Sequence, residues 1–326
     1  MEKFDFVTVG NCTTNMILRF DDFPAIGKTS TATNPFGDEI LYGGCVFNVF
    51  YALTKLGCRV KPVLRWSDPD ARDRLYEILD EYDLPKDHII APKTRSYNRC
   101  ILLQDRNQNH ATIIYRFGED SDHSSLYDTP IEVDEESFSD SKMMLMVMGN
   151  PQYSYRILQI LDEMGLDFAF SYKNDPALLP KELCEAILPK AKIIFTNESE
   201  AKHLCSLLGL GKMTDYLYSG KAEVVVTTLG CKGSLVQSLD AEGRIRCEVV
   251  PITHCEHHKV DSVGCGDAFV AGFMYGYSRG KSLGLCAQYG STLSSFVLEG
   301  RGPTSNLPDL EQMLERNARR SDARSE

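Results

Sequence analysis

The sequence predicts an α/β protein whose main domain is a doubly wound, mostly parallel sheet with helices on both faces, joined to a small β-sheet lid. Three observations support this fold class. Short apolar runs alternate with amphipathic helical stretches along most of the chain, which is typical of parallel strands joined by helices. Glycine follows several of the helical stretches, where a left-handed residue commonly ends a helix. Two strand-like segments near residue 100 break this alternation and indicate the lid.

Six apolar runs are predicted to form the buried strands of the main sheet, because each is short and bounded by turn-forming residues. They are residues 6–9, 60–64, 143–148, 167–170, 193–195 and 224–227. Between them the pattern predicts helices at residues 49–56, 153–164 and 198–208, which are followed by Gly57, Gly165 and Gly209. Strands separated by helices in this way favour parallel pairing.

Two segments interrupt this alternation. Residues 13–41 are loop-rich with strand-like pieces, and residues 94–120 contain two predicted strands, 100–104 and 111–115. We expect the two segments to pair into one small sheet. The exposed edges of such a sheet need to be covered, so the sheet is expected to lie over a bound ligand as a lid or against a second subunit. The main domain then comprises residues 1–12, 42–93 and 121–316, and the arginine-rich residues 317–326 are expected to form a flexible tail.

Composition restricts the class of partner and the compartment. The 326 residues carry a formal net charge of −11, which argues against nucleic acid because its phosphates require clustered cations. The 11 cysteines are scattered singly, without a C-x-x-C pair, which predicts the reduced thiols of a cytoplasmic protein. The chain has no apolar run long enough to span a membrane and no signal-peptide pattern, so we expect neither a membrane anchor nor export.

The strongest functional pattern is V-D-S-V-G-C-G-D-A-F, which ends at Phe269 and leads into a nearly all-apolar helix. Gly264 and Gly266 allow backbone N–H groups to converge at a helix N-terminus, where an anion is favoured. Asp267 stands at the same place, and a carboxylate there suits a general base that accepts a proton from an approaching hydroxyl. From these residues alone, a helix N-cap is an equally good interpretation of Asp267.

This segment resembles the C-terminal signature of the ribokinase (PfkB) family of carbohydrate and nucleoside kinases, D-T-x-G-A-G-D-x-F, with Ser262 for Thr and Cys265 for Ala. The resemblance implies transfer of the γ-phosphoryl group of ATP to a hydroxyl of a sugar or nucleoside. Asp267 would deprotonate that hydroxyl. The N–H groups of Gly264, Cys265 and Gly266 would stabilise the charge on the transferred group.

A second segment, Y-G-G-C-V-F-N, is similar to the family's N-terminal signature. The resemblance implies that Gly43, Gly44 and Asn48 contact the acceptor, although a turn and a helix cap are the ordinary roles of such residues. Sugar-kinase relatives carry Asp at the position of Asn15, and some carry an acid near Asn150. Because both positions are amides here, the acceptor is expected to differ from free ribose. Sugar and nucleoside stay equally open.

Two further segments match the part of the family that binds the nucleotide. Asn197 and Glu200 correspond to its N-x-x-E motif near Mg²⁺ and the phosphates, although Asn and Glu at this spacing also form a capping box. Thr228, Gly230 and Gly233 correspond to its nucleotide-phosphate segment. The resemblance therefore implies ATP and Mg²⁺ as cofactors, with Glu200 acting on the Mg²⁺ indirectly.

The fifth segment, E-G-R-G-P-T-S-N-L-P, resembles the loop near the adenine and a monovalent cation, which many relatives also hold with the residue matching Asp261. Dependence on K⁺ is therefore an open prediction. Two alternatives to the kinase of a free sugar or nucleoside remain: a non-catalytic ligand-binding protein of the same fold, or a kinase for a phosphorylated sugar that uses Lys28, Arg99 or Arg116. Relatives often dimerise through the lid, so a homodimer is among the oligomeric states left open.

Overall fold

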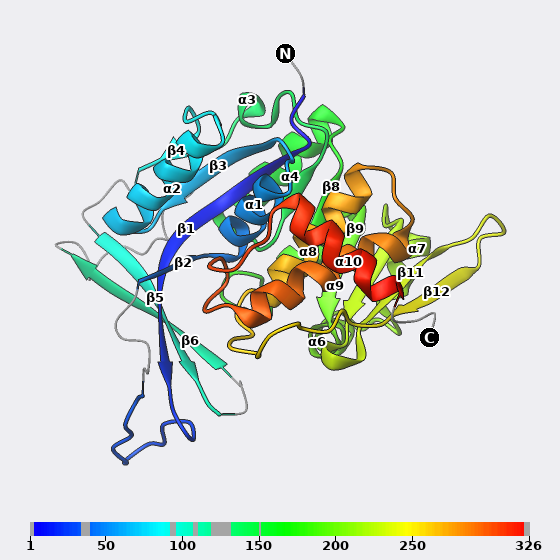
Figure 1. The fold of residues 1–326 in the computed structure, drawn as a ribbon. Helices are drawn as coiled ribbons and strands as arrows, with labels where there is room; N and C mark the ends of the chain where they lie inside the picture. Colours follow the sequence, from blue (N-terminus) through cyan, green and yellow to red (C-terminus); the bar gives the residue numbers. More distant parts are fainter. Residues whose placement is uncertain are drawn as a thin grey trace.

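A computed structural model describes residues 3–33, 40–91, 96–106, 110–118, 132–149 and 151–322, so that the predicted acceptor ligand Asn150 lies outside the described residues. The chain forms a central sheet with helices on both faces, and a smaller group of strands extends from one side of it (Figure 1). The predicted α/β fold class is confirmed.

The six predicted strands lie in the main sheet. Its order in the described part of the chain is β12-β11-β10-β9-β8-β7-β1-β3-β4, with parallel neighbours from β10 to β4 and an antiparallel edge at β11 and β12. The central strands read as continuous apolar runs because helices bury both faces of the sheet. The strands are β1 (Phe6–Arg19), β3 (Val60–Trp66), β4 (Ile89–Ile90), β7 (Met144–Met146), β8 (Phe168–Ser171), β9 (Ile193–Asn197), β10 (Val224–Thr228), β11 (Ser234–Leu239) and β12 (Ile245–Val250).

Two buried clusters, one on each face, hold the helices to the sheet. The first cluster takes side chains from α1 (Cys45–Lys55), α2 (Pro69–Glu81), α8 (Cys265–Ser278), α9 (Leu283–Glu299) and α10 (Leu310–Asp322). The second takes them from α3 (Glu135–Phe138), α4 (Pro151–Met164), α5 (Lys181–Ile187), α6 (Glu198–Leu208) and α7 (Tyr216–Ser219). Short 3₁₀ turns occur at η1 (Leu188–Lys190), η2 (Met213–Asp215) and η3 (Gly230–Lys232). None of the described helices is long and apolar enough to cross a membrane.

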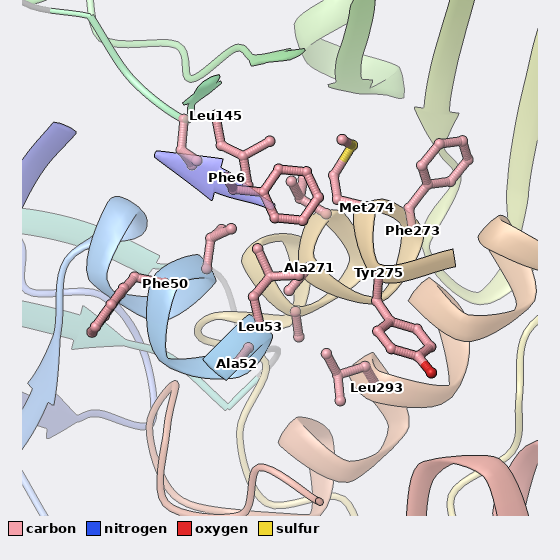
Figure 2. Close-up of a cluster of buried hydrophobic side chains, with 14 of the residues drawn as sticks. Phe6, Phe50, Ala52, Leu53, Leu145, Ala271, Phe273, Met274, Tyr275 and Leu293 are labelled. Atoms are coloured by element: carbon pink, nitrogen blue, oxygen red, sulfur yellow. The ribbon is translucent and has the colours of Figure 1, made fainter. Parts of the chain in front are cut away.

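Helix α8 is buried on nearly every side, as its almost continuous apolar sequence requires. Figure 2 shows Phe6 of β1, Leu53 of α1 and Met274 of α8 in one cluster, with Leu293 of α9 close by, and all four side chains are buried. Each large apolar side chain in such a cluster contributes about 1.5–3 kcal/mol relative to an exposed one. This packing fixes the N-terminus of α8, where the predicted catalytic segment begins.

The lid grows out of the first strand of the main sheet. Strand β1 pairs with β3 as far as Cys12, and from Thr13 onward it pairs with β2 (Leu41–Gly43) and β5 (Ser96–Gln104) instead. Strand β6 (His110–Gly118) completes the lid as the antiparallel partner of β5, as predicted for this hairpin (Figure 1). The first residues of segment 13–41, predicted to be loop-rich, instead continue β1 to Arg19, where β2 and β5 pair with them.

Of the expected C-terminal tail, the described residues 317–322 belong to a helix. Helix α10 continues to Asp322, and the side chains of Arg316 and Asn317 bond to α9 through Glu299 and Thr292. Some of the polar side chains that suggested a flexible tail therefore form hydrogen bonds to the rest of the protein.

The Glu299 carboxylate is 2% exposed and connects three segments. It accepts hydrogen bonds from the Glu256 and His257 N–H groups and from Arg316, at 2.6 to 3.1 Å. Burial opposes its charge, but the hydrogen bonds from Arg316 and the two backbone N–H groups lower the pKa of Glu299 overall. A carboxyl whose pKa is lower in the folded state stabilises the fold above its unfolded pKa and loses that effect as the pH falls.

We therefore expect Glu299→Gln to lower the free energy of unfolding by about 3 kcal/mol at pH 7, because it leaves the buried Arg316 with only the more distant Glu256 carboxylate, 3.5 Å away. The deficit relative to the wild type should shrink as the pH falls below about 4, where Glu299 of the wild type also becomes neutral. Urea denaturation of both proteins at the two pH values measures this. A deficit that is the same at both would contradict the assignment.

Candidate active site

The predicted site residues gather at one edge of the main sheet, where parallel strands end and helices begin. Thr228 is the last residue of β10, and Asn197 is the last residue of β9. Asn48 lies in the first turn of α1 and Asp267 in the first turn of α8. In open α/β sheets, ligands bind outside the carboxyl ends of the strands, so this edge is the expected place for a site.

Asp267 is 4% exposed and is held by two side chains from other elements. Asn48 Nδ2 donates to its Oδ2 at 2.7 Å, and the Lys173 ammonium lies 3.1 Å from its Oδ1. The N-cap of α8 is Gly264, and the contacts that the structure describes for the Asp267 carboxylate go to Asn48 and Lys173 rather than to the first N–H groups of the helix. The interpretation of Asp267 as a simple N-cap is therefore wrong.

The paired glycines before α1 bring the backbone of β1 close to Asn48. Gly44 has φ 102°, and a Cβ there would lie 2.5 Å from the Asn11 carbonyl oxygen. A Cβ on Gly43 would lie 2.2 Å from Asn15 Nδ2, so Asn15 packs directly on this turn. Gly44, not Asn48, is the N-cap of α1, which excludes the cap interpretation of Asn48.

The turn before α8 supplies backbone donors for an anion. Gly264 has φ 85°, and a Cβ there would lie 2.4 Å from Cβ of Pro303, so only glycine fits. The Cys265 N–H donates to the Ser262 carbonyl at 3.2 Å, which corrects the prediction that all three N–H groups are available. Within the described parts of the chain, the N–H groups of Gly264 and Gly266 have no hydrogen-bond partner.

A cavity of about 380 Å³ opens beside this turn. Its lining contains the three predicted nucleotide ligands Thr228, Gly230 and Gly233, together with Cys265 and Gly266 of the α8 turn. Phe269 and Leu298 add apolar surface. A volume of this size lies within the range of small-molecule sites, and the cavity continues to the backbone donors that would face a phosphate.

Asn197 and Glu200 form the capping box that the sequence allowed. Glu200 Oε2 accepts from the Asn197 N–H at 2.7 Å, and Asn197 Oδ1 accepts from the Glu200 N–H at 2.8 Å. Burial raises the pKa of Glu200, and the charge of Lys173 partly offsets that shift. Among the described residues no group of three acidic, His or Cys side chains could hold a metal. One partly buried carboxylate fits a Mg²⁺ ion bound mainly by phosphates and water.

Asp261 is buried against backbone and side-chain N–H donors. Its Oδ1 accepts from Gln104 Nε2 at 3.1 Å and from the Val263 N–H at 3.0 Å, and its Oδ2 accepts from the Gly302 N–H at 3.0 Å. These neutral donors already compensate the carboxylate, so dependence on K⁺ stays a prediction. Because Gln104 belongs to β5, Asp261 also joins the lid to the α8 turn.

Lys173 is a site residue that the sequence patterns did not indicate. It follows β8 by two residues, in the segment S-Y-K-N-D, which matches none of the five motifs. Its position in the sequence could have indicated a role in the site, because a charged residue just beyond the carboxyl end of a buried parallel strand lies at the ligand-binding edge of the sheet.

A parallel sheet with helices on both faces, a glycine-rich helix N-terminus and a buried carboxylate beside a cavity together define an α/β enzyme for an anionic ligand. The chain belongs to the pfkB family of carbohydrate kinases, whose model matches residues 3–310. It is therefore an ATP-dependent small-molecule kinase, which transfers a phosphoryl group to a sugar or a nucleoside.

Similar proteins include kinases of both acceptor classes. A nucleoside kinase of Methanothermobacter thermautotrophicus is 25% identical over 97% of this chain and 96% of its own length. A deoxyribokinase of Salmonella typhimurium is 21% identical over 95% and 98%. The crystal structure of a Burkholderia thailandensis nucleoside kinase in complex with inosine superposes with a TM-score of 0.79 at 20% identity, covering 96% of this chain and 97% of that one.

Three cysteines of the cavity differ in expected reactivity. Cys231 is exposed, whereas burial raises the pKa of Cys255 and Cys265. Because the thiolate is the reactive form, iodoacetamide should modify Cys231 first, and ATP at ten times its Kd should slow that reaction about tenfold. Peptide mass spectrometry with and without ATP measures this, and exposed Cys247 outside the cavity is the control. Equal modification of Cys231 in both samples would exclude nucleotide from this cavity.

Proposed function

We propose that this kinase transfers the γ-phosphoryl group of ATP to a hydroxyl of a nucleoside, with Asp267 as the general base. The observation that carries the proposal is the position of the Asp267 carboxylate. It lies in the first turn of α8, close to unpaired backbone N–H groups, and Asn48 orients it through Oδ2. The carboxylate can accept a proton from an attacking hydroxyl, and the adjacent turn can bind the phosphoryl group that the hydroxyl attacks.

In this reaction the acceptor oxygen forms a bond to the γ-phosphorus while the bond from that phosphorus to the β–γ bridging oxygen breaks. The proton of the acceptor hydroxyl passes to Asp267, and ADP leaves with the bridging oxygen. The N–H groups of Gly264 and Gly266 stabilise charge on the transferred group. Mg²⁺ bound with ATP would neutralise part of the phosphate charge, with Glu200 acting on it through water.

Amide side chains support a neutral, hydroxyl-rich acceptor under the lid. Asn98 is 3% exposed, and neither polar atom of its side chain has a partner among the described residues. It lies on the same face of β5 as Cys100, which contacts Thr13, and Thr13 in turn donates to Asn15 Oδ1 at 3.2 Å. A buried amide without a partner is costly, and ribose hydroxyls would satisfy both its donor and its acceptor.

The charges of the lid argue against a phosphorylated acceptor. Arg99 is ion-paired to Asp70 at 2.7 Å and lies 3.6 Å from Asp68, so its charge is already matched. Lys28 and Arg116 are exposed. The nucleoside is favoured over the free sugar because the relative from Methanothermobacter, similar along nearly its whole length, is a nucleoside kinase.

The proposed base is tested by ADP release from Mg·ATP in the presence of a panel of nucleosides, free sugars and sugar phosphates. Asp267→Asn should lower kcat by about 10²–10⁴-fold, the usual effect of losing a general base, while the protein stays folded. Asp162→Asn, which breaks the surface ion pair with Lys190, is the matched control and should keep full activity. Activity of Asp267→Asn within a few-fold of the wild type would remove Asp267 from this role.

Asn98→Leu tests the acceptor site separately. Leucine has the same branching and number of heavy atoms as asparagine but no polar atoms, so it removes the buried groups that lack a partner, and the protein should stay folded. The KM for the nucleoside should rise about tenfold, equivalent to roughly 1.4 kcal/mol, while the KM for ATP stays unchanged. Steady-state kinetics with each substrate varied in turn measure both constants. An unchanged KM for every acceptor would place Asn98 outside the acceptor site.

A further inference from the structure

Lys173 lies between the proposed base and the proposed anion site. Its ammonium is 3.1 Å from Asp267 Oδ1, and it is 3.6 Å from the point that a Cβ on Gly266 would occupy. The Lys173 side chain is 28% exposed, so it is only partly buried beside Asp267. A cation at this point can reach both the carboxylate and a group bound at the α8 turn.

Lys173 carries its charge at neutral pH. Burial lowers its pKa, but the carboxylate of Asp267 and, more weakly, that of Glu200 raise the pKa overall. The ammonium therefore brings a full positive charge to a turn that otherwise offers only partial charges from backbone N–H groups.

An exclusive ion pair between Lys173 and Asp267 would work against the proposed reaction, because a neighbouring cation makes a carboxylate a weaker base. Asp267 has other support at the same place, namely the Asn48 amide and the helix N-terminus. The ammonium is thus better placed for a second anion that arrives with the substrate. A transferred phosphoryl group has three outer oxygens, and with Cys265 N–H engaged by Ser262, two of the three predicted backbone donors remain.

We propose that Lys173 is a catalytic residue whose ammonium binds an outer oxygen of the transferred phosphoryl group, taking the place of the third donor. This inference rests on the proposed phosphoryl transfer at Asp267. The ammonium keeps its three protons and forms no covalent bond. It neutralises charge that develops as the β–γ bridge breaks, and its contact with the phosphoryl oxygen weakens its hold on Asp267.

The test compares affinities for Mg·AMPPNP and Mg·ADP, measured by calorimetry without an acceptor, so that the result does not depend on which acceptor is used. Lys173→Gln should lower the preference for the triphosphate analogue by about tenfold, the scale of one charge-assisted contact, with the ADP affinity unchanged. Lys173→Arg should retain most of the preference and also serves if the Gln variant does not fold. Lys192→Gln is the matched control, because that lysine is 25% exposed and ion-paired to Asp167 at the opposite edge of the sheet.

The decisive comparison is made in the Asp267→Asn background. If Lys173 only neutralised Asp267, its removal would no longer affect nucleotide preference once residue 267 is an amide. A further loss of preference in the double variant supports the proposed contact, and an unchanged preference overturns it. A rise in KM confined to sugar phosphates, with the preference intact, would instead assign Lys173 to the acceptor and also overturn it.

Kinetics separate this inference from the proposed function. With a nucleoside that the wild type accepts, Lys173→Gln should lower kcat by about 10²–10³-fold, the usual effect of losing one such stabilising group, with the KM for the nucleoside within twofold. If the wild type acts on no nucleoside, the proposed acceptor is wrong, while the nucleotide preference still decides the role of Lys173.

Discussion

The hydrogen bond from Asn48 to Asp267 joins the first turns of α1 and α8, and the site depends on that junction. Both helices begin at glycines whose backbone conformations exclude other residues, and Pro303 packs against the glycine turns of both. Behind the junction, the two helices share the buried cluster of Figure 2. Because the packing fixes the helices and the glycines fix their first turns, the Asp267 carboxylate is positioned without any contribution from a bound ligand.

Charge is distributed unevenly around this junction. The charges of Arg99 in the lid and of Asp261 below it are compensated within the protein, since Arg99 pairs with Asp70 and Asp261 accepts hydrogen bonds from three N–H groups. Among the described residues, the buried polar atoms without a hydrogen-bond partner on the lid side are both amide atoms of Asn98 and Nε of Arg99, whose charge is matched by Asp70 and Asp68. On the α8 side the N–H groups of Gly264 and Gly266 have no partner within the described chain. The site therefore divides into a half that suits hydroxyls and a half that suits an anion, which is the division that a kinase requires.

Much of this arrangement could be read from the chain because local chemistry determines it. Apolar runs located the strands, and a positive-φ glycine ended α6 where expected, whereas α8 begins at Cys265, three residues before the predicted start. Tertiary contacts decided the rest. Whether Asp267 caps a helix or faces a site depends on the distant Asn48 and Lys173, and no local pattern links residue 173 to residue 267. The hydrogen bond from the Cys265 N–H to the Ser262 carbonyl is local, but it depends on the exact conformation of one turn, which the residue pattern does not determine. The polar residues at the end of α10 stay helical because Thr292 and Glu299 of α9 bond to their side chains.

Strand β1 is continuous from the core of the molecule to the tip of the lid, and it changes partners between Cys12 and Thr13 without a break in its hydrogen bonding. At this connection β1 enters the lid without an intervening loop. The same strand packs on the turn before α1, through the Asn11 carbonyl against Gly44 and the Asn15 side chain against Gly43. A change in the twist of β1 within the lid would therefore be transmitted to the start of α1.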